Sequence, residues 1–200
     1  HIDRNGHGTA ITGLLAGTGH ENPGVAPSAQ IIVLKALDVR GMGRWSWIAH
    51  ALERAADLHA HIVVMALGGD DRSLLVEDML EVLAENGGLA IVAAGNGGHE
   101  RIDFPGYSPL VIAVGAVDKD GRIPEWSAGG PWPESPDVVG PGVDIPAMSL
   151  SGGYRLLSGT SLATAAVGGA LALHVSVFGP LVPLGGMAQV RYENDPKWGI

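Results

Sequence analysis

Four apolar runs of strand length most constrain what this chain can fold into. They cover residues 31–37, 62–67, 89–94 and 110–117, and Lys35 is the one charged residue inside them. A strand that faces water on one side alternates apolar and polar residues, whereas a solid apolar run is typical of a strand covered on both faces. We therefore expect a parallel sheet that is buried between layers of helices.

Helical patterns occupy the spaces between these runs. Small and apolar residues predict a short helix over 10–17, and apolar residues at helical spacing predict longer helices over 44–59 and around 75–83. A further helix is expected to start near Ser161. Strands that alternate with helices indicate an α/β protein, with three layers (α/β/α) around a mostly parallel sheet.

Length and composition indicate one domain and exclude several functions. The chain has 200 residues, a net charge of -9 and no basic run, so an electrostatic nucleic-acid interface is not expected. Its lack of cysteine excludes disulfides, thiol catalysis and cysteine-based zinc sites. The apolar runs are too broken for a transmembrane helix, so no membrane partner is expected. The tail over residues 178–200 contains prolines and little periodicity, and we assign it no structure.

Three residues in this frame could together perform acyl transfer. Asn96 follows a predicted strand, Ser161 lies in the first turn of a predicted helix, and His7 lies at the start of another. A serine nucleophile, an imidazole base and an amide donor are the parts that this chemistry needs. Each residue alone has a plainer interpretation, because serine often caps helices, asparagine often occupies turns, and histidine is common on surfaces.

Three sequence motifs resemble those of the subtilisin-like serine proteases. They are His7-Gly8-Thr9 with Gly13, then Ala93-Ala94-Gly95-Asn96, then Ser158-Gly159-Thr160-Ser161-Leu162-Ala163-Thr164. Their order and spacing match that family over about residues 5–175. The resemblance implies a serine endopeptidase that acts on protein or peptide substrates.

The resemblance also implies a role for each matching residue. Ser161 would attack the peptide carbonyl, His7 would carry the proton, and Asn96 would hold the oxyanion together with the Ser161 backbone N–H. The substrate would be bound by Ala66, Leu67, Gly68, Ala93, Ala94 and Gly95. Asp103, just before Phe104-Pro105-Gly106, would lie near the base of the specificity pocket and favour Lys or Arg before the scissile bond. Its plainer interpretation is a solvated loop residue.

The chain also departs from the family pattern. The family's catalytic aspartate precedes the histidine by a few tens of residues, so we expect a domain that is incomplete at its N-terminus and nearly inactive alone, with a missing N-terminal segment or pro-segment as a partner. Asp3 lies too close to His7 to be promoted to that role. Ala66 and Ala165 stand where serine and proline are usual. The loop over 19–27 is short, so the calcium that some relatives bind has no assignable site.

Two alternatives to an active protease stay open. One is an inactive subtilisin-like protein with a peptide-binding or scaffold role, which the substituted residues favour. The other is a nucleotide-binding protein, but Gly95-Asn96-Gly97 lacks the third glycine of that fingerprint. No cofactor or metal is expected, because pairs such as His59 and His61 fit a solvated surface far better than a metal site. Secretion is implied by the resemblance, although no signal peptide is visible in this chain.

Overall fold

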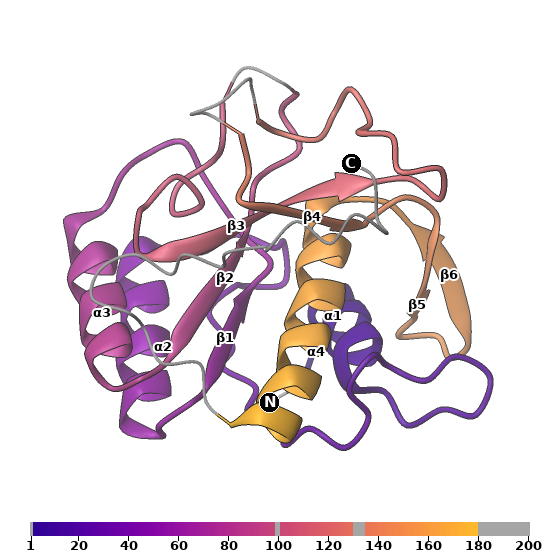
Figure 1. The fold of residues 1–200 in the computed structure, drawn as a ribbon, viewed down its shortest axis with the longest axis horizontal. Helices are drawn as coiled ribbons and strands as arrows, with labels where there is room; N and C mark the ends of the chain where they lie inside the picture. Colours follow the sequence, from indigo (N-terminus) through magenta and orange to yellow (C-terminus); the bar gives the residue numbers. More distant parts are fainter. Residues whose placement is uncertain (1, 99–100, 130–134, 180–200) are drawn as a thin grey trace.

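A parallel sheet forms the centre of the molecule (Figure 1). The computed structural model describes residues 2–98, 101–129 and 135–179. Its strands pair in parallel in the order of the chain, and they are β1 (Ile62–Met65), β2 (Leu89–Ala93), β3 (Val111–Val117) and β4 (Val138–Pro141). Three of the predicted apolar runs therefore form adjacent strands, and the prediction of a mostly parallel sheet is confirmed.

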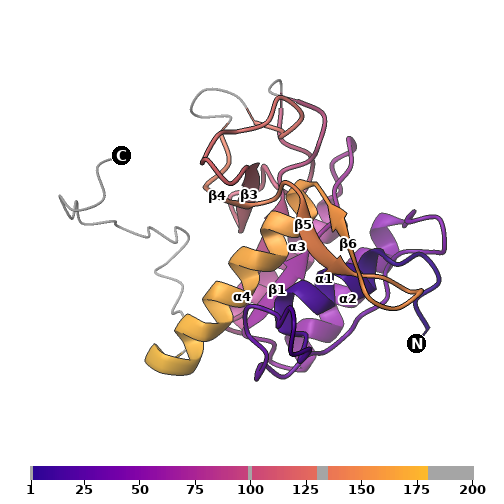
Figure 2. The same cartoon turned by 90° about the vertical axis from the view of Figure 1, so that its right-hand side faces the viewer.

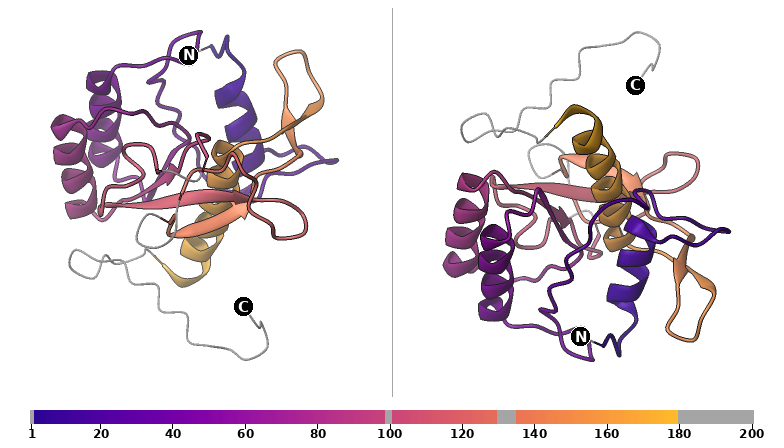
Figure 3. Two further views of the ribbon diagram at one scale, coloured as in Figure 1. Left: turned by 90° about the horizontal axis from the view of Figure 1, so that it is seen from above. Right: turned by 90° about the horizontal axis from the view of Figure 1, so that it is seen from below.

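Helices cover both faces of this sheet, and Figure 3 shows the two helical layers on its opposite sides. They are α1 (His7–Ala16), α2 (Trp45–Asp57), α3 (Leu74–Glu85) and α4 (Thr160–Phe178). Alternate residues of β2 reach the two layers, since Ala90 and Val92 pack with α2 and α3 while Ile91 packs against Ala163 of α4. The predicted three-layer arrangement is thus confirmed.

Helix α4 packs unusually close to its neighbours in its middle turns. A methyl group added to Gly168 would lie 2.6 Å from Val64 Cγ2, and one added to Gly169 would lie 2.6 Å from Val25 Cβ. By length and composition α4 could cross a membrane, with a mean hydropathy of 1.6. Its N-terminal half lies in the core, where Leu162, Ala163 and Ala165 are buried. Its last turns extend beyond the fold and expose Val177 and Phe178 (Figure 2).

The prediction of a doubly buried strand over residues 31–37 is wrong. This segment has no ladder partner among the described residues, and Ile32 and Val33 are 46% and 60% exposed. Leu34 and Ala36 do pack against the core beside α2. An apolar run becomes a doubly covered strand only where a neighbouring strand pairs with it, and β1 ends the described sheet with an unpaired edge.

A hairpin that the sequence did not predict lies beside α1. Strands β5 (Ile145–Met148) and β6 (Tyr154–Leu157) pair in antiparallel fashion and form a separate two-stranded sheet. Ala147 packs with Ala10 and Leu162, so the hairpin covers the region where α1 meets the start of α4.

Candidate active site

Ser161 lies where the carboxyl ends of the parallel strands meet the first turn of α4. Its Oγ donates a hydrogen bond to the backbone oxygen of Ala66, at 3.3 Å, and Ala66 directly follows β1. The first turn of a helix has free N–H groups and the positive end of the helix dipole. The Ser161 backbone N–H has no acceptor among the hydrogen bonds of the described residues. Negative charge that develops beside Ser161 would therefore meet a free donor.

Asn96 lies against the same helix end, although it belongs to the loop after β2. Its Oδ1 accepts a hydrogen bond from the Thr160 backbone N–H at 2.9 Å. Because a backbone N–H can only donate, this contact identifies the side-chain atom as oxygen and leaves Nδ2 as the free donor. Asn96 is itself exposed, so its Nδ2 is accessible to a ligand.

Thr160 ties the Asn96 loop to α4. Its side chain is fully buried, and Oγ1 lies 3.2 Å from the backbone N and O of Gly95 and from Asn96 Oδ1. Thr160 lies within the third sequence motif, but no role was predicted for it. The sequence does contain a signal for this role. Thr160 is a polar residue at the start of an apolar helix, and a hydroxyl that is buried there needs hydrogen-bond partners.

His7 is the first residue of α1, and its helix packs against the start of α4. Ala10 and Ile11, one turn further along α1, share an apolar cluster with Leu162, the residue after Ser161. His7 and Ser161 are thus brought to the same region, but their side chains share no hydrogen bond in the described structure. Burial lowers the pKa of the His7 imidazole, and the charge of Asp3 partly offsets this effect.

Asp3 acts on α1 as a helix cap. Its Oδ1 accepts hydrogen bonds from the backbone N–H groups of Asn5 and Gly6, both at 2.9 Å. Its Oδ2 accepts from the backbone N–H and Oγ1 of Thr9, both at 2.8 Å. Although burial raises the pKa of the Asp3 carboxyl, these hydrogen bonds from Gly6, Thr9 and Asn5 outweigh burial and hold it far below its usual range. Both oxygens are thus engaged by groups other than His7.

The residues predicted to bind substrate lie together at the carboxyl ends of the neighbouring strands β1 and β2. Residues 66–68 continue from the end of β1, and residues 94 and 95 continue from Ala93 at the end of β2. Asp103 joins them through its backbone N–H, which donates to Ala94 O at 2.8 Å. Its side chain lies against two glycines, because a methyl group added to Gly68 would lie 2.9 Å from Asp103 Cβ and one added to Gly95 would overlap the carboxylate.

The surroundings of Asp103 disfavour its charge. Burial raises the pKa of the Asp103 carboxyl, the nearby charge of Asp70 raises it further, and Arg101 lowers it. No hydrogen bond from a described residue stabilises the carboxylate. A positively charged ligand side chain would supply the missing counter-charge.

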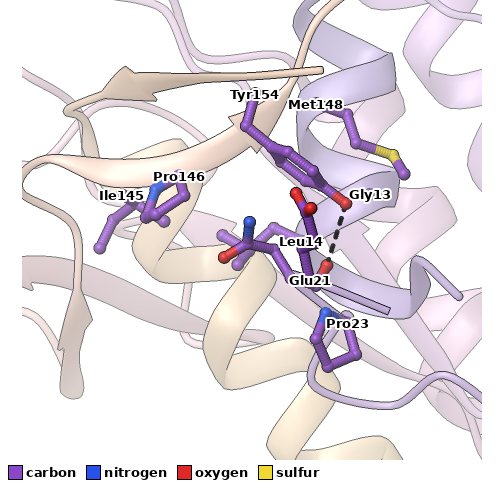
Figure 4. Close-up of a pocket in the computed structure, with 9 residues that line it drawn as sticks. Gly13, Leu14, Glu21, Pro23, Ile145, Pro146, Met148 and Tyr154 are labelled. Atoms are coloured by element: carbon purple, nitrogen blue, oxygen red, sulfur yellow. Dashed lines mark hydrogen bonds between the residues drawn. The ribbon is translucent and has the colours of Figure 1, made fainter. Parts of the chain in front are cut away.

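A separate cavity of about 200 Å³ lies between α1 and the β5–β6 hairpin (Figure 4). The loop over 19–27 supplies Glu21, Asn22 and Pro23 to its wall, and the Tyr154 hydroxyl donates to the backbone oxygen of Asn22 at 3.3 Å. Calcium takes six to eight oxygen ligands. One carboxylate does not form such a set, and within the described ranges no group of three or more His, Asp or Glu could hold a metal ion. No calcium site is therefore assigned among the described residues.

Comparison with protein families identifies this arrangement. The model of the subtilase family, peptidase S8, matches residues 2–185. The chain belongs to the subtilase family. Among solved structures, this subtilase is similar to sphericase, with a TM-score of 0.84 and 30% identity over 90% of this chain and 66% of sphericase. The prediction of a subtilisin-like fold is therefore confirmed.

Sequence relatives agree with this assignment. This subtilase is 37% identical to a thermophilic serine proteinase of Bacillus sp. (strain AK1), over 88% of this chain and 44% of that protein. It is 36% identical to an intracellular serine protease of Paenibacillus polymyxa (86% and 54%) and 34% identical to subtilisin E of Bacillus subtilis (87% and 46%). The chain spans about half the length of these relatives. Since one relative is named as intracellular, secretion stays a prediction for this subtilase.

Proposed function

We propose that this subtilase is the catalytic part of a serine endopeptidase that hydrolyses protein or peptide substrates. The observation that carries the proposal is the contact between Asn96 Oδ1 and the Thr160 N–H at 2.9 Å. It holds Asn96 at the N-terminus of α4 and leaves Nδ2 as its donor, next to the residue whose backbone N–H has no acceptor among the described residues, Ser161. Two fixed donors beside a nucleophile are what an oxyanion of acyl transfer requires.

In this mechanism Ser161 Oγ attacks the carbonyl carbon of the scissile peptide bond. His7 accepts the hydroxyl proton as the carbon–oxygen bond forms, and it returns that proton to the amine as the carbon–nitrogen bond breaks. Water then releases the acyl group by the same steps. The Oγ must first leave the Ala66 oxygen that it contacts in the described structure, so substrate binding would free the nucleophile.

The carboxylate that orients His7 is proposed to come from outside the described residues. The charge of the Asp3 carboxylate acts on His7. Its two oxygens, however, already accept hydrogen bonds from the backbone N–H groups of Gly6 and Thr9 at the start of α1. In the triad mechanism this group holds the imidazole in the correct tautomer and stabilises the imidazolium.

Substrate backbone would lie along residues 66–68, with residues 93–95 lining the pocket for the side chain before the scissile bond. Asp103 contacts both segments through Gly68 and Gly95. A carboxylate there favours lysine or arginine through a charge-assisted hydrogen bond.

Labelling with a fluorophosphonate probe tests the proposed nucleophile. The intact parent protein, with the carboxylate that orients His7 in place, is expected to be labelled and to hydrolyse casein, and Ser161→Ala in that protein is expected to lose both. Ser176→Ala is a matched control, because the exposed Ser176 hydroxyl bonds only to Leu173 O in the described structure. Labelling that persists in Ser161→Ala would assign the nucleophile elsewhere. An intact parent protein that folds but stays unlabelled would favour the alternative, an inactive relative with a peptide-binding or scaffold role.

A further inference from the structure

Asp70 and Asp103 face each other across an antiparallel backbone contact. Gly69 and Phe104 exchange two backbone hydrogen bonds, each of 2.9 Å, and so form a directly opposed pair. In this geometry the adjacent residues Asp70 and Asp103 are also opposed, with both side chains on one face. Like charges in such a position repel, so this pair of carboxylates favours any cation that can reach both.

One cation of the chain already contacts the outer carboxylate. Arg101 forms an ion pair with Asp70, and the two side chains are 62% and 76% exposed. The inner carboxylate, Asp103, receives no donor from the described residues. The site therefore holds two carboxylates and one guanidinium. The Arg101 guanidinium contacts Asp70, which is the more exposed of the two carboxylates.

The inner carboxylate is adjacent to the proposed catalytic residues. Gly95, whose backbone Asp103 contacts, directly precedes Asn96 and is bonded to Thr160 Oγ1 at 3.2 Å. Gly68 ends the segment that begins at Ala66, the residue that accepts the Ser161 hydrogen bond. The two aspartates thus lie beside the segments that carry Ala66 and Asn96, with Asp103 half-buried and Asp70 exposed.

We propose that Asp70 and Asp103 together recognise the ammonium or guanidinium group of a lysine or arginine that precedes the scissile bond, and that Arg101 competes with this group for Asp70. The inference rests on the proposed peptidase function, because that function places the substrate along residues 66–68 and 93–95. It adds Asp70 as a second specificity-determining residue and Arg101 as a resident competitor. A structural ion pair that only holds the loop before Asp103 is the competing explanation.

Binding of p-aminobenzamidine, followed by its fluorescence, tests the site without catalysis. Asp103→Asn is expected to weaken binding by at least about tenfold, since it removes a charged hydrogen-bond partner. Asp70→Asn should weaken binding by about two- to fivefold, as expected for an exposed charge pair. Arg101→Gln should strengthen it by a similar factor, because Asp70 is then released to the ligand. Asp71→Asn and Arg72→Gln are matched controls that change the same charges next to the site.

The double variant Asp70→Asn/Arg101→Gln separates competition from a general field effect. If Arg101 acts through Asp70, its removal gives no gain once Asp70 is neutral. If the double variant still binds p-aminobenzamidine more tightly than Asp70→Asn alone, Arg101 acts only as a distant charge. That result would overturn the proposed competition for Asp70. A merely structural ion pair predicts that Asp70→Asn and Arg101→Gln change affinity in the same direction and lower the melting temperature together.

Hydrolysis of matched peptides with arginine or leucine before the scissile bond completes the test. Asp70→Asn should lower kcat/KM for the arginine peptide through KM and leave the leucine peptide unchanged. Wild-type protein that does not bind p-aminobenzamidine, or binding that is indifferent to Asp70 and Asp103, would overturn the inference even if Ser161 is labelled. Binding with the expected pattern but without Ser161 labelling would instead contradict the peptidase function alone.

Discussion

The backbone N–H of Thr160 donates to Asn96 Oδ1 at 2.9 Å, so one side chain caps α4 through its oxygen and keeps its amide nitrogen as a donor. Two functions are combined in Asn96, and two substitutions can separate them. Asp retains an oxygen for Thr160 and adds a negative charge that a helix N-terminus favours. Ala retains neither the acceptor nor the donor.

We expect Asn96→Asp to lose turnover while keeping stability, and Asn96→Ala to lose both. Turnover should fall by at least about 10²–10³-fold, a magnitude borrowed from the oxyanion asparagine of a subtilisin and not obtained from this structure. The measurements are kcat in the active protein and the free energy of unfolding, with the exposed Asn86→Ala as control. Unchanged turnover in Asn96→Asp would remove the amide nitrogen from the mechanism.

Asp3→Asn should destabilise the fold by about 1 kcal/mol at neutral pH, the usual loss for a helix cap. The pKa of Asp3 is lowered in the folded protein, so its stabilisation is present above the ordinary carboxyl pKa and is lost as pH falls toward the folded value. The difference between wild type and variant should therefore shrink in acid. Urea unfolding at neutral and acidic pH measures it, with exposed Asp71→Asn as control. A pH-independent difference would contradict the charged cap.

The His7 imidazole is expected to titrate below its ordinary pKa of about 6.5, because burial disfavours its charged form. The neutral ring, which can accept a proton, therefore persists to lower pH than for an exposed histidine. Asp3→Asn should lower the midpoint further, since the charge of Asp3 raises it. NMR titration of the ring protons, assigned with His7→Gln, measures this. A midpoint at or above the ordinary value would contradict the burial argument.

The 200-residue chain alone is expected to hydrolyse casein only marginally. In the described residues no carboxylate is free to orient His7, and loss of that group costs roughly 3 × 10⁴ in turnover in a subtilisin, again a borrowed value. The unpaired edge of β1 and the exposed Ile32 and Val33 also favour aggregation, which Val33→Lys should reduce. Turnover is measured against Ser161→Ala as blank. Robust hydrolysis that depends on Ser161 would mean that Asp3 or another carboxylate orients His7.

The fold could be predicted where a local pattern was sufficient. The runs that became β1, β2 and β3 are apolar because sheet neighbours and two helical layers cover them, and their sequence carries that signal. Residues 31–37 carry the same signal, yet their burial depends on a pairing that the described sheet does not contain. The β5–β6 hairpin was missed because its strands are short, although Gly152-Gly153 with positive φ marked the turn between them.

The candidate site was predictable as a set of residues but not as a geometry. Motifs identified Asn96 and Ser161, whereas the contact that orients Asn96 joins residues 64 positions apart. Likewise Asp70 was not singled out, because its relation to Asp103 arises only from the backbone pairing of Gly69 with Phe104. The sequence shows only that Asp70 is a carboxylate soon after the end of a strand. Such a residue is equally typical of a solvated turn, so this position alone does not indicate a binding role.

The close approach at Gly168 and Gly169 has a practical consequence for engineering. These residues seat α4 against Val64 and Val25 midway along its length, so the position of Ser161 is fixed from a point some two turns into the helix. The exposed turns that end at Phe178 lie on the far side of this anchor. Reporter domains or surface tethers attached there should leave the nucleophile undisturbed, whereas a single methyl group at Gly168 would act directly on its support.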